Sequence, residues 1–214
     1  MSGARDTPLR AVVTDFGGVL TTPLLDAFAR ANAELGISVE ALGAAMRLSA
    51  ERAGEPPLFK LERGQISEPE FIGDLAASLG EVLGRSVDLD GYGARLMGSL
   101  ERNEPLLAYY RRLHARGIRF AILTNNVREW QPIWRAKLAA DDIFELIVDS
   151  GFEGVRKPEP EIYALTLERL GLPGGACAFV DDLEVNLPPA REAGMHAIHY
   201  RDPEQAIAEL DALF

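Results

Sequence analysis

The sequence predicts an α/β fold: a Rossmann-like parallel sheet with helices on both faces, plus an all-helical cap inserted after the first strand. From residue 105 onward, short apolar segments alternate with segments of helical periodicity, a pattern typical of right-handed βαβ units. One earlier apolar segment, residues 9–14, is separated from these by a long stretch of helical pattern. We therefore expect a helical insertion to cut the first strand off from the rest of its sheet.

The inserted stretch is predicted to form a series of helices. Residues 24–35 repeat apolar side chains at helical spacing and stop before a glycine, and a second helix covers residues 38–53. The Glu-Pro-Pro sequence at residues 55–57 breaks the pattern. Residues 67–70 form a capping box before another helix, and residues 89–102 form a further helix that three glycines weaken.

The second half is predicted to supply the rest of the sheet. A helix with an apolar face precedes the first of these strands, and another covers residues 160–170. Four strands are expected, at residues 118–123, 144–148, 177–180 and 195–198. This pattern assigns residues 1–21 and 102–214 to an α/β core domain and residues 22–101 to a helical cap domain.

Polar residues recur where the predicted strands and their connections end. In open α/β sheets, ligands bind outside the carboxyl ends of the strands, so these residues predict one polar site at one edge of the sheet. They comprise Asp15, Thr124, Asn125, Lys157, Asp181 and Asp182.

Each of these residues on its own has a more common explanation. An aspartate after a strand usually caps a helix, a Thr-Asn pair usually forms a turn, and a Lys-Pro pair is usually solvated. Their occurrence together, in this order along the chain, favours a site for a phosphoryl group.

These motifs resemble those of the haloacid dehalogenase-like hydrolase superfamily, and the resemblance covers the whole chain. The branch that they resemble includes the N-terminal phosphatase domain of soluble epoxide hydrolase and bacterial sugar-phosphate phosphatases. Residues 61–67, LERGQIS, are similar to the cap signature of that branch. The four motifs of the superfamily match, in order, Asp15, then Thr124, then Lys157, then Asp181-Asp182 with Asn186.

The resemblance implies a C1-type cap and a Mg²⁺-dependent hydrolase, most simply a phosphatase acting on a small phosphorylated metabolite. Asp15 would attack in line and form an aspartyl-phosphate. Lys157 would offset the charge of the transferring oxygens, and Thr124 and Asn125 would help to bind the substrate.

The same resemblance implies a magnesium site. The ligands would be Asp15, the backbone carbonyl of Gly17, and Asp182, since oxygen atoms suit this ion. Behind them, Asp181 would orient Asp182 or a bound water, and Asn186 would hydrogen-bond Lys157 or a carboxylate.

Gly17 departs from the superfamily pattern. Most phosphatases of the superfamily carry a second aspartate there, which protonates the leaving group and is typically worth about 10² to 10⁴ in rate. Three explanations remain open: a good leaving group, replacement of the acid by another group or by water, or a protein that binds phosphorylated ligands without efficient turnover. A 2-haloacid dehalogenase is a third functional alternative, which the paired Asp181-Asp182 disfavours.

Composition limits the other functions. The 214 residues carry a formal charge of −11, which argues against a nucleic-acid surface. The single cysteine, Cys177, cannot form an internal disulfide and is expected to be buried. No segment has the length and hydrophobicity of a membrane span, and residues 1–6 lack the apolar stretch of a signal peptide. We therefore expect a soluble cytoplasmic protein, monomeric or homodimeric.

Aromatic residues near the predicted site have mainly structural interpretations. Trp130 and Trp134 are four residues apart and are expected to pack against the sheet rather than to stack on a substrate. Phe59 and Lys60 are expected in a proline-rich cap loop, where contact with a substrate and a surface role are both open.

Overall fold

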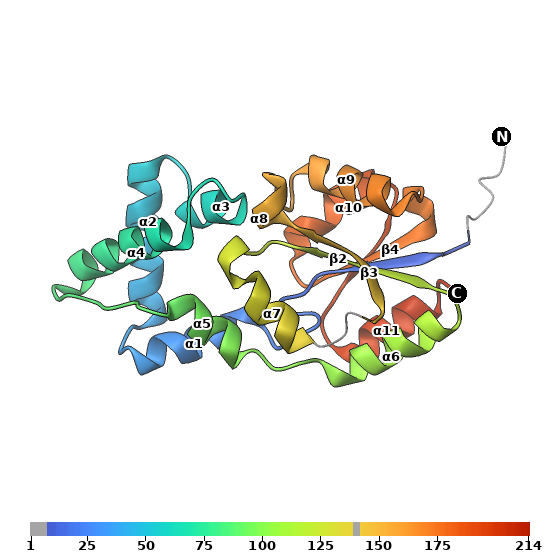
Figure 1. The fold of residues 1–214 in the computed structure, drawn as a ribbon, viewed down its shortest axis with the longest axis horizontal. Helices are drawn as coiled ribbons and strands as arrows, with labels where there is room; N and C mark the ends of the chain where they lie inside the picture. Colours follow the sequence, from blue (N-terminus) through green and yellow to red (C-terminus); the bar gives the residue numbers. More distant parts are fainter. Residues whose placement is uncertain (1–7, 139–141) are drawn as a thin grey trace.

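The computed structural model describes residues 8–138 and 142–214 (Figure 1). Within these residues, five parallel strands form one sheet in the order β3-β2-β1-β4-β5. The predicted fold class is confirmed. The strands are β1 (Ala11–Thr14), β2 (Arg119–Thr124), β3 (Phe144–Asp149), β4 (Cys177–Asp181) and β5 (His196–His199).

The central strand β1 is buried along its whole length, as is its neighbour β4. Such strands read as continuous apolar runs because helices cover both faces of a parallel sheet. In the register, Thr14 pairs with Ile122 of β2 on one side and with Val180 of β4 on the other. The residues that follow these strands therefore reach the same edge of the sheet.

Helices cover both faces of the sheet (Figure 1). On one face, Val12 of β1 belongs to a core cluster with residues of α6 (Glu104–Ala115) and α11 (Pro203–Asp211). On the other, Val13 belongs to a cluster with residues of α9 (Pro160–Leu170) and α10 (Leu187–Glu192). Adjacent residues of a strand point to opposite faces, which is why neighbouring valines belong to different clusters.

A helical insertion lies between β1 and β2, beyond one end of the sheet (Figure 1). The chain enters and leaves it side by side, because Thr21 and Arg102 form an isolated antiparallel bridge. The division into domains at residues 21 and 102 stays a prediction. The helices of the insertion are α1 (Leu24–Glu34), α2 (Val39–Ala53), α3 (Pro57–Glu62), α4 (Glu68–Leu83) and α5 (Tyr92–Ser99).

Two parts of the insertion differ from expectation. Phe59 and Lys60 lie in the short helix α3, not in a loop, because Pro57 occupies the first helical position, where a missing N–H is tolerated. The last helix is shorter than predicted: Gly91, with a φ of +65°, precedes it, and Leu100 ends it in an extended conformation. The predicted capping box before α4 is present.

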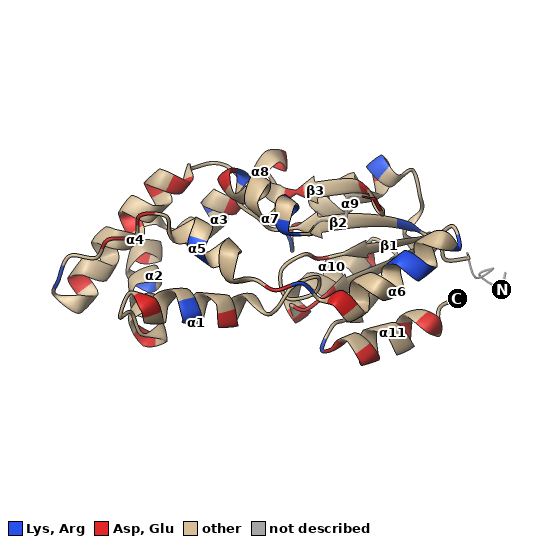
Figure 2. Cartoon of the chain, turned by 60° about the horizontal axis from the view of Figure 1, so that its bottom comes forward, with Lys and Arg blue, Asp and Glu red and all other residues tan. Residues whose placement is uncertain are grey.

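Charged residues are interspersed on the helices: Figure 2 shows acidic and basic residues alternating along α1. Cys177 is buried, as expected. No helix in the described residues is long and apolar enough to cross a membrane. Residues 1–6, on which the expectation about a signal peptide rests, lie outside the described residues.

Candidate active site

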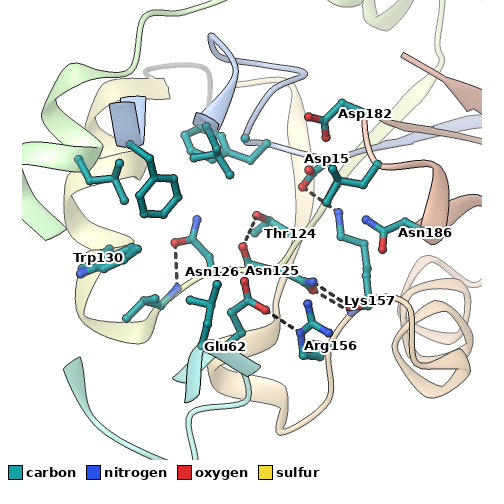
Figure 3. Close-up of a pocket in the computed structure, with 18 of the residues that line it drawn as sticks. Asp15, Glu62, Thr124, Asn125, Asn126, Trp130, Arg156, Lys157, Asp182 and Asn186 are labelled. Atoms are coloured by element: carbon teal, nitrogen blue, oxygen red, sulfur yellow. Dashed lines mark hydrogen bonds and ion pairs between the residues drawn. The ribbon is translucent and has the colours of Figure 1, made fainter. Parts of the chain in front are cut away.

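Asp15 lies directly beyond β1, at the edge of the sheet that faces the helical insertion. Its backbone N–H donates to the carbonyl of Val180 at 2.8 Å, which continues the pairing with β4 by one residue. The side chain is nearly buried, and its Oδ1 lies 2.8 Å from Nζ of Lys157 (Figure 3). A carboxylate and a buried ammonium group therefore face each other at the end of the central strand.

Lys157 comes from the connection between α8 (Ser150–Glu153) and α9, and Asn125 fixes its position. The amide Nδ2 of Asn125 donates to the Lys157 carbonyl at 2.9 Å, and Oδ1 accepts from the Lys157 N–H at 2.8 Å. Burial disfavours the charged form of Lys157, but Asp15 and Asp181 outweigh this effect and raise its pKa above the ordinary value. Lys157 is therefore held as a cation.

Asp181 has partners for both of its oxygens. Its Oδ2 accepts from Nζ of Lys157 at 2.6 Å, and its Oδ1 accepts from Nδ2 of Asn186 and from the N–H of Leu183, each at 2.9 Å. The sequence left open whether Asn186 contacts the lysine or a carboxylate, and the structure selects the carboxylate. Asp181 and Asn186 thus support Lys157 from behind.

Asp182 is less satisfied than its neighbour. Its Oδ1 is buried and has no hydrogen-bond partner among the described residues. Burial raises the pKa of Asp182 to about 6, and the charge of Asp181 adds to the increase. A buried carboxylate oxygen without a partner is unfavourable in a protein interior, and a bound cation would remove that penalty.

The acidic cluster fits a divalent cation. Carboxylate oxygens of Asp15, Asp181 and Asp182 lie within 4.8 Å of one another. Burial raises the pKa of Asp15, and the other two carboxylates raise it further against the opposing effect of Lys157. Lys157 can offset only one of the three negative charges. A doubly charged ion bound through carboxylate oxygens would balance the other two.

Gly18 allows Asp182 to reach this position. A Cβ atom on Gly18 would lie 2.2 Å from Oδ2 of Asp182, and its φ of +86° is a conformation that favours glycine. The neighbouring Gly17 is restricted from the other side, because a Cβ there would lie 2.7 Å from Cδ1 of Leu24 in α1. The leucine of the insertion thus crowds the space where a side chain at position 17 would begin.

A cavity of about 390 Å³ opens above these residues. Thr124 is buried at the end of β2 and lines it, as do Asn125 and Asn126. The structure therefore gathers around one cavity or directly behind it every residue of the predicted site: Asp15, Gly17, Thr124, Asn125, Lys157, Asp181, Asp182 and Asn186.

Sequence reasoning missed several lining residues. Glu62 of α3 accepts from Nε of Arg156 at 2.6 Å, and both side chains line the cavity (Figure 3). Burial raises the pKa of Glu62, although Arg156 opposes the effect. The signals were their positions, Glu62 within the cap signature and Arg156 beside Lys157. Trp130 also lines the cavity, whereas Trp134 is fully buried against Phe16, with ring centroids 4.8 Å apart.

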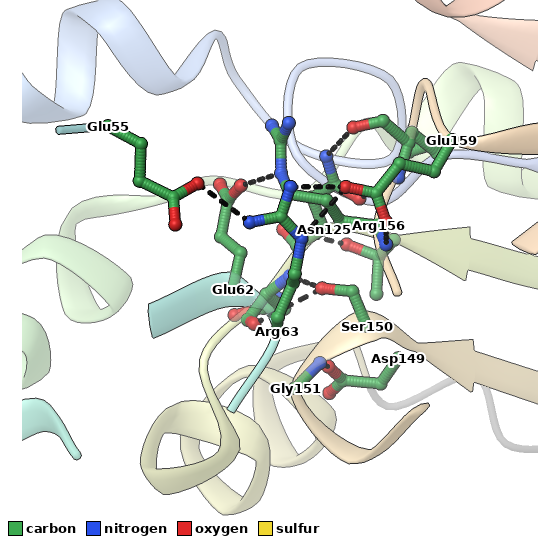
Figure 4. A network of polar contacts seen from close by, with 12 residues as sticks. Glu55, Glu62, Arg63, Asn125, Asp149, Ser150, Gly151, Arg156 and Glu159 are labelled. Carbon is green, nitrogen blue, oxygen red and sulfur yellow. Dashed lines mark hydrogen bonds and ion pairs between the residues drawn. The ribbon is translucent and has the colours of Figure 1, made fainter. Parts of the chain in front are cut away.

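Polar contacts hold α3 against the core (Figure 4). Nε of Arg63, which caps the C-terminus of α3, donates to Oε1 of Glu159 at 2.8 Å, and Arg63 also pairs with Glu55 at 3.0 Å. The guanidinium of Arg156 stacks over Phe59 at 3.9 Å. The contacts of Arg63 with Glu159 and of Arg156 with Phe59 link the insertion to the connection that carries Lys157, whereas the Arg63–Glu55 pair lies within the insertion.

Comparison with known proteins shows which family and which relatives this chain resembles. A family model described as haloacid dehalogenase-like hydrolase matches residues 9–194. Acyl-CoA dehydrogenase family member 10 of Mus musculus is 29% identical over 99% of this chain and 20% of its own length. Bifunctional epoxide hydrolase 2 of Sus scrofa is 28% identical over 95% of this chain and 38% of its own length. This chain therefore spans only a minor part of these two relatives.

Two further similarities extend over nearly the full length of both chains. Sesquiterpene phosphatase astK of Aspergillus oryzae is 27% identical, with 97% of each chain covered. The crystal structure of a magnesium complex of a HAD family enzyme from Bacteroides thetaiotaomicron has a TM-score of 0.63 at 20% identity and covers 91% of this chain and 94% of its own. The second likeness concerns the fold alone.

Proposed function

Because this chain belongs to the haloacid dehalogenase-like hydrolases, we propose that it is a Mg²⁺-dependent phosphatase that acts on a small phosphorylated metabolite through Asp15. One observation carries the proposal: the carboxylate of Asp15 lies beside the Lys157 ammonium and the unsatisfied oxygen of Asp182, under a cavity with room for an organic group. The full-length similarity to a phosphatase supports the same reaction class.

Asp15, the carbonyl of Gly17 and Asp182 would hold the magnesium ion, which would supply positive charge for the phosphoryl oxygens. An oxygen of Asp15 attacks the phosphorus atom as the bond to the leaving oxygen breaks, so that an aspartyl-phosphate forms. The leaving oxygen takes a proton from water and departs as the alcohol. Water then attacks the same phosphorus atom and releases inorganic phosphate and the Asp15 carboxylate.

Lys157 and Thr124 interact with the phosphoryl group in this mechanism. The ammonium of Lys157 is fixed by Asp15 and Asp181 before substrate arrives, so it needs no reorganisation to stabilise charge on the transferring oxygens. Thr124 offers a hydroxyl at the end of β2. Asn125 acts on the reaction through Lys157, because both ends of its amide bind the lysine backbone.

The test is phosphate release from a panel of phosphorylated metabolites, with Mg²⁺ and with EDTA. We expect release that requires the metal and is lost in Asp15→Asn, with the folded state of the variant verified by circular dichroism. Release that continues in EDTA, or full activity in Asp15→Asn, would contradict the proposal.

Gly17 favours one alternative, a module that binds phosphorylated ligands without turning them over. The position where most relatives of this superfamily carry an acid has no side chain, and Leu24 crowds it. That alternative predicts thermal stabilisation by phosphorylated ligands with no phosphate release. Turnover that depends on Asp15 would exclude it.

A further inference from the structure

The cavity above Asp15 is polar at its base and at the Glu62–Arg156 pair, and Asn126 adds a further polar side chain to its wall. Asp15, Lys157 and Asp182 form the end that would take a phosphoryl group. The helical insertion supplies apolar side chains for most of the remaining wall, and Trp130 joins them from the core. These side chains include Leu25, Phe28, Leu58, Phe59, Met97 and Trp130.

A second cavity, of about 220 Å³, lies further inside the insertion. It is bounded by α1, α2 and α4, with Leu42 and Met46 from α2 and Phe71 and Leu75 from α4. It shares four lining residues with the first cavity, so the two spaces adjoin. The shared residues are Leu25, Phe28, Leu58 and Trp130.

The inner cavity offers few polar groups to a ligand. Asn32 and Tyr92 line it, and the Tyr92 hydroxyl donates to Oδ1 of Asn32 at 2.9 Å. Two buried donors on its wall, Nδ2 of Asn32 and Nε1 of Trp130, have no partner among the described residues. In the outer cavity, the carboxyl group that the insertion contributes, Glu62, is paired with Arg156. In the inner cavity, a ligand with several hydroxyl groups would leave most of them without partners, which is unfavourable in a buried site.

Apolar side chains are also exposed at the rims of both cavities. Leu25 is 80% exposed and Leu183 is 53% exposed at the outer cavity, and Val39 is 62% exposed at the inner one. Exposed apolar groups that border a cavity are typical of a site that receives an apolar ligand.

We propose that the substrate is the monophosphate ester of an apolar alcohol, whose phosphoryl group lies at Asp15 and whose hydrocarbon tail extends past Leu58 into the inner cavity. This inference rests on the proposed phosphatase function and names its substrate class. Sugar phosphates are disfavoured because the inner cavity offers few partners for several hydroxyl groups, whereas each buried methylene gains favourable transfer free energy.

Binding of alkylphosphonates tests the proposal without requiring turnover. Ethyl-, hexyl- and decylphosphonate are titrated in Mg²⁺ below their critical micelle concentrations. We expect the dissociation constant to fall by about 100-fold or more from ethyl to decyl, since each buried methylene contributes up to about fourfold. Dissociation constants that agree within about threefold across the series would overturn the proposal.

A pair of matched variants locates the tail. Val39 borders the inner cavity. Val82 of α4 is also an exposed valine, but it is not among the described residues that line either of these two cavities. Val39→Asp should reduce the gain from ethyl to decyl by about tenfold because a charge at the rim must be desolvated, and Val82→Asp should preserve it. An equal effect of the two variants would refute the assignment of the inner cavity. Because both valines are exposed, we expect both variants to fold.

Measurements of phosphate release distinguish the proposed apolar substrate from the proposed phosphatase function. Asp15-dependent phosphate release from ethyl phosphate that does not improve with decyl phosphate would refute the apolar substrate and leave the phosphatase function standing. Chain-length-dependent binding without phosphate release from any ester would refute the phosphatase function and support the apolar site.

Discussion

At the residue scale, two adjacent glycines determine which side chains can lie close to the reacting groups. Gly18 lets Asp182 approach, and Gly17 leaves space that Leu24 enters. The first is a backbone requirement with a positive φ, whereas the second is a contact with one flexible side chain. The two positions therefore predict different outcomes when a side chain is added.

Gly18→Ala should abolish Mg²⁺-dependent phosphate release, because its Cβ would displace the Asp182 carboxylate. Gly54→Ala is the matched control: its φ of +79° is similar, but apart from the adjoining chain no atom of the described residues lies within 4 Å of the added Cβ. The control should lose about 1 kcal/mol of unfolding free energy through backbone strain alone and keep its activity. Full activity in Gly18→Ala would contradict this role of the glycine.

Gly17→Asp alone should lower activity, since the new side chain meets Leu24. Combined with Leu24→Ala, it should raise kcat for esters with poor leaving groups by about tenfold or more, a fraction of what a general acid typically contributes. Steady-state kinetics on both variants and on Leu24→Ala alone checks this expectation. No difference between the single and double Gly17 variants would show that Leu24 is not the obstacle.

At the element scale, helix α3 links the insertion to the loop that carries Lys157. Arg156 and Glu62 are mostly buried, so removing one partner leaves the other charge without compensation. Arg156→Met should lower the unfolding free energy by about 3 kcal/mol and raise KM, because the pair also lines the cavity.

The double variant Arg156→Met/Glu62→Gln should recover part of this loss. The control is Arg52→Met, which breaks an exposed pair with Glu81 on the same insertion and should leave both stability and KM nearly unchanged. Urea unfolding and kinetics provide the comparison. A loss in Arg52→Met equal to that in Arg156→Met would refute the linking role of α3.

The sequence predicted elements wherever periodicity was strong. The strands around β1 and the capping box at Ser67 are confirmed, since apolar runs and side-chain caps are local signals. Helix α3 was missed because two prolines read as a break, although the second fits the first turn of a helix. Its length of six residues also gives little periodicity.

At the scale of the whole molecule, the site could be predicted as a set of residues but not as a geometry. Polar residues at strand ends meet at one edge because the strands are parallel and in register. The roles that the resemblance implies for them stay predictions. The Arg156–Glu62 pair and the crowding of Gly17 by Leu24 depend on how the insertion packs on the core, which no local pattern encodes.

Global stability should depend on pH through Asp149, which ends β3 and caps α8. Burial raises its pKa from 3.8 to about 6, against an opposing hydrogen bond from the Gly151 N–H. Between these two values the folded protein binds more protons than the unfolded chain, so the free energy of unfolding falls as pH rises. Above pH 6 the penalty for burying the charge is fully present.

Asp149→Asn stays neutral and should escape this penalty. Relative to the unmodified protein, the variant should gain about 1 to 3 kcal/mol of stability between pH 4 and pH 7. Urea unfolding at several pH values measures the difference, with Asp26→Asn on exposed α1 as the control. A difference that does not change with pH would contradict the assignment.

The most direct test of nucleophilic attack by Asp15 is to trap the phosphoryl group on the protein. The protein is mixed with its best phosphate ester and Mg²⁺, quenched in acid within the first turnover, and digested for mass spectrometry. We expect a phosphoryl group on the peptide that contains Asp15, and none in EDTA or in Asp15→Asn. A phosphoryl group on another residue, or rapid phosphate release with none on Asp15, would contradict it.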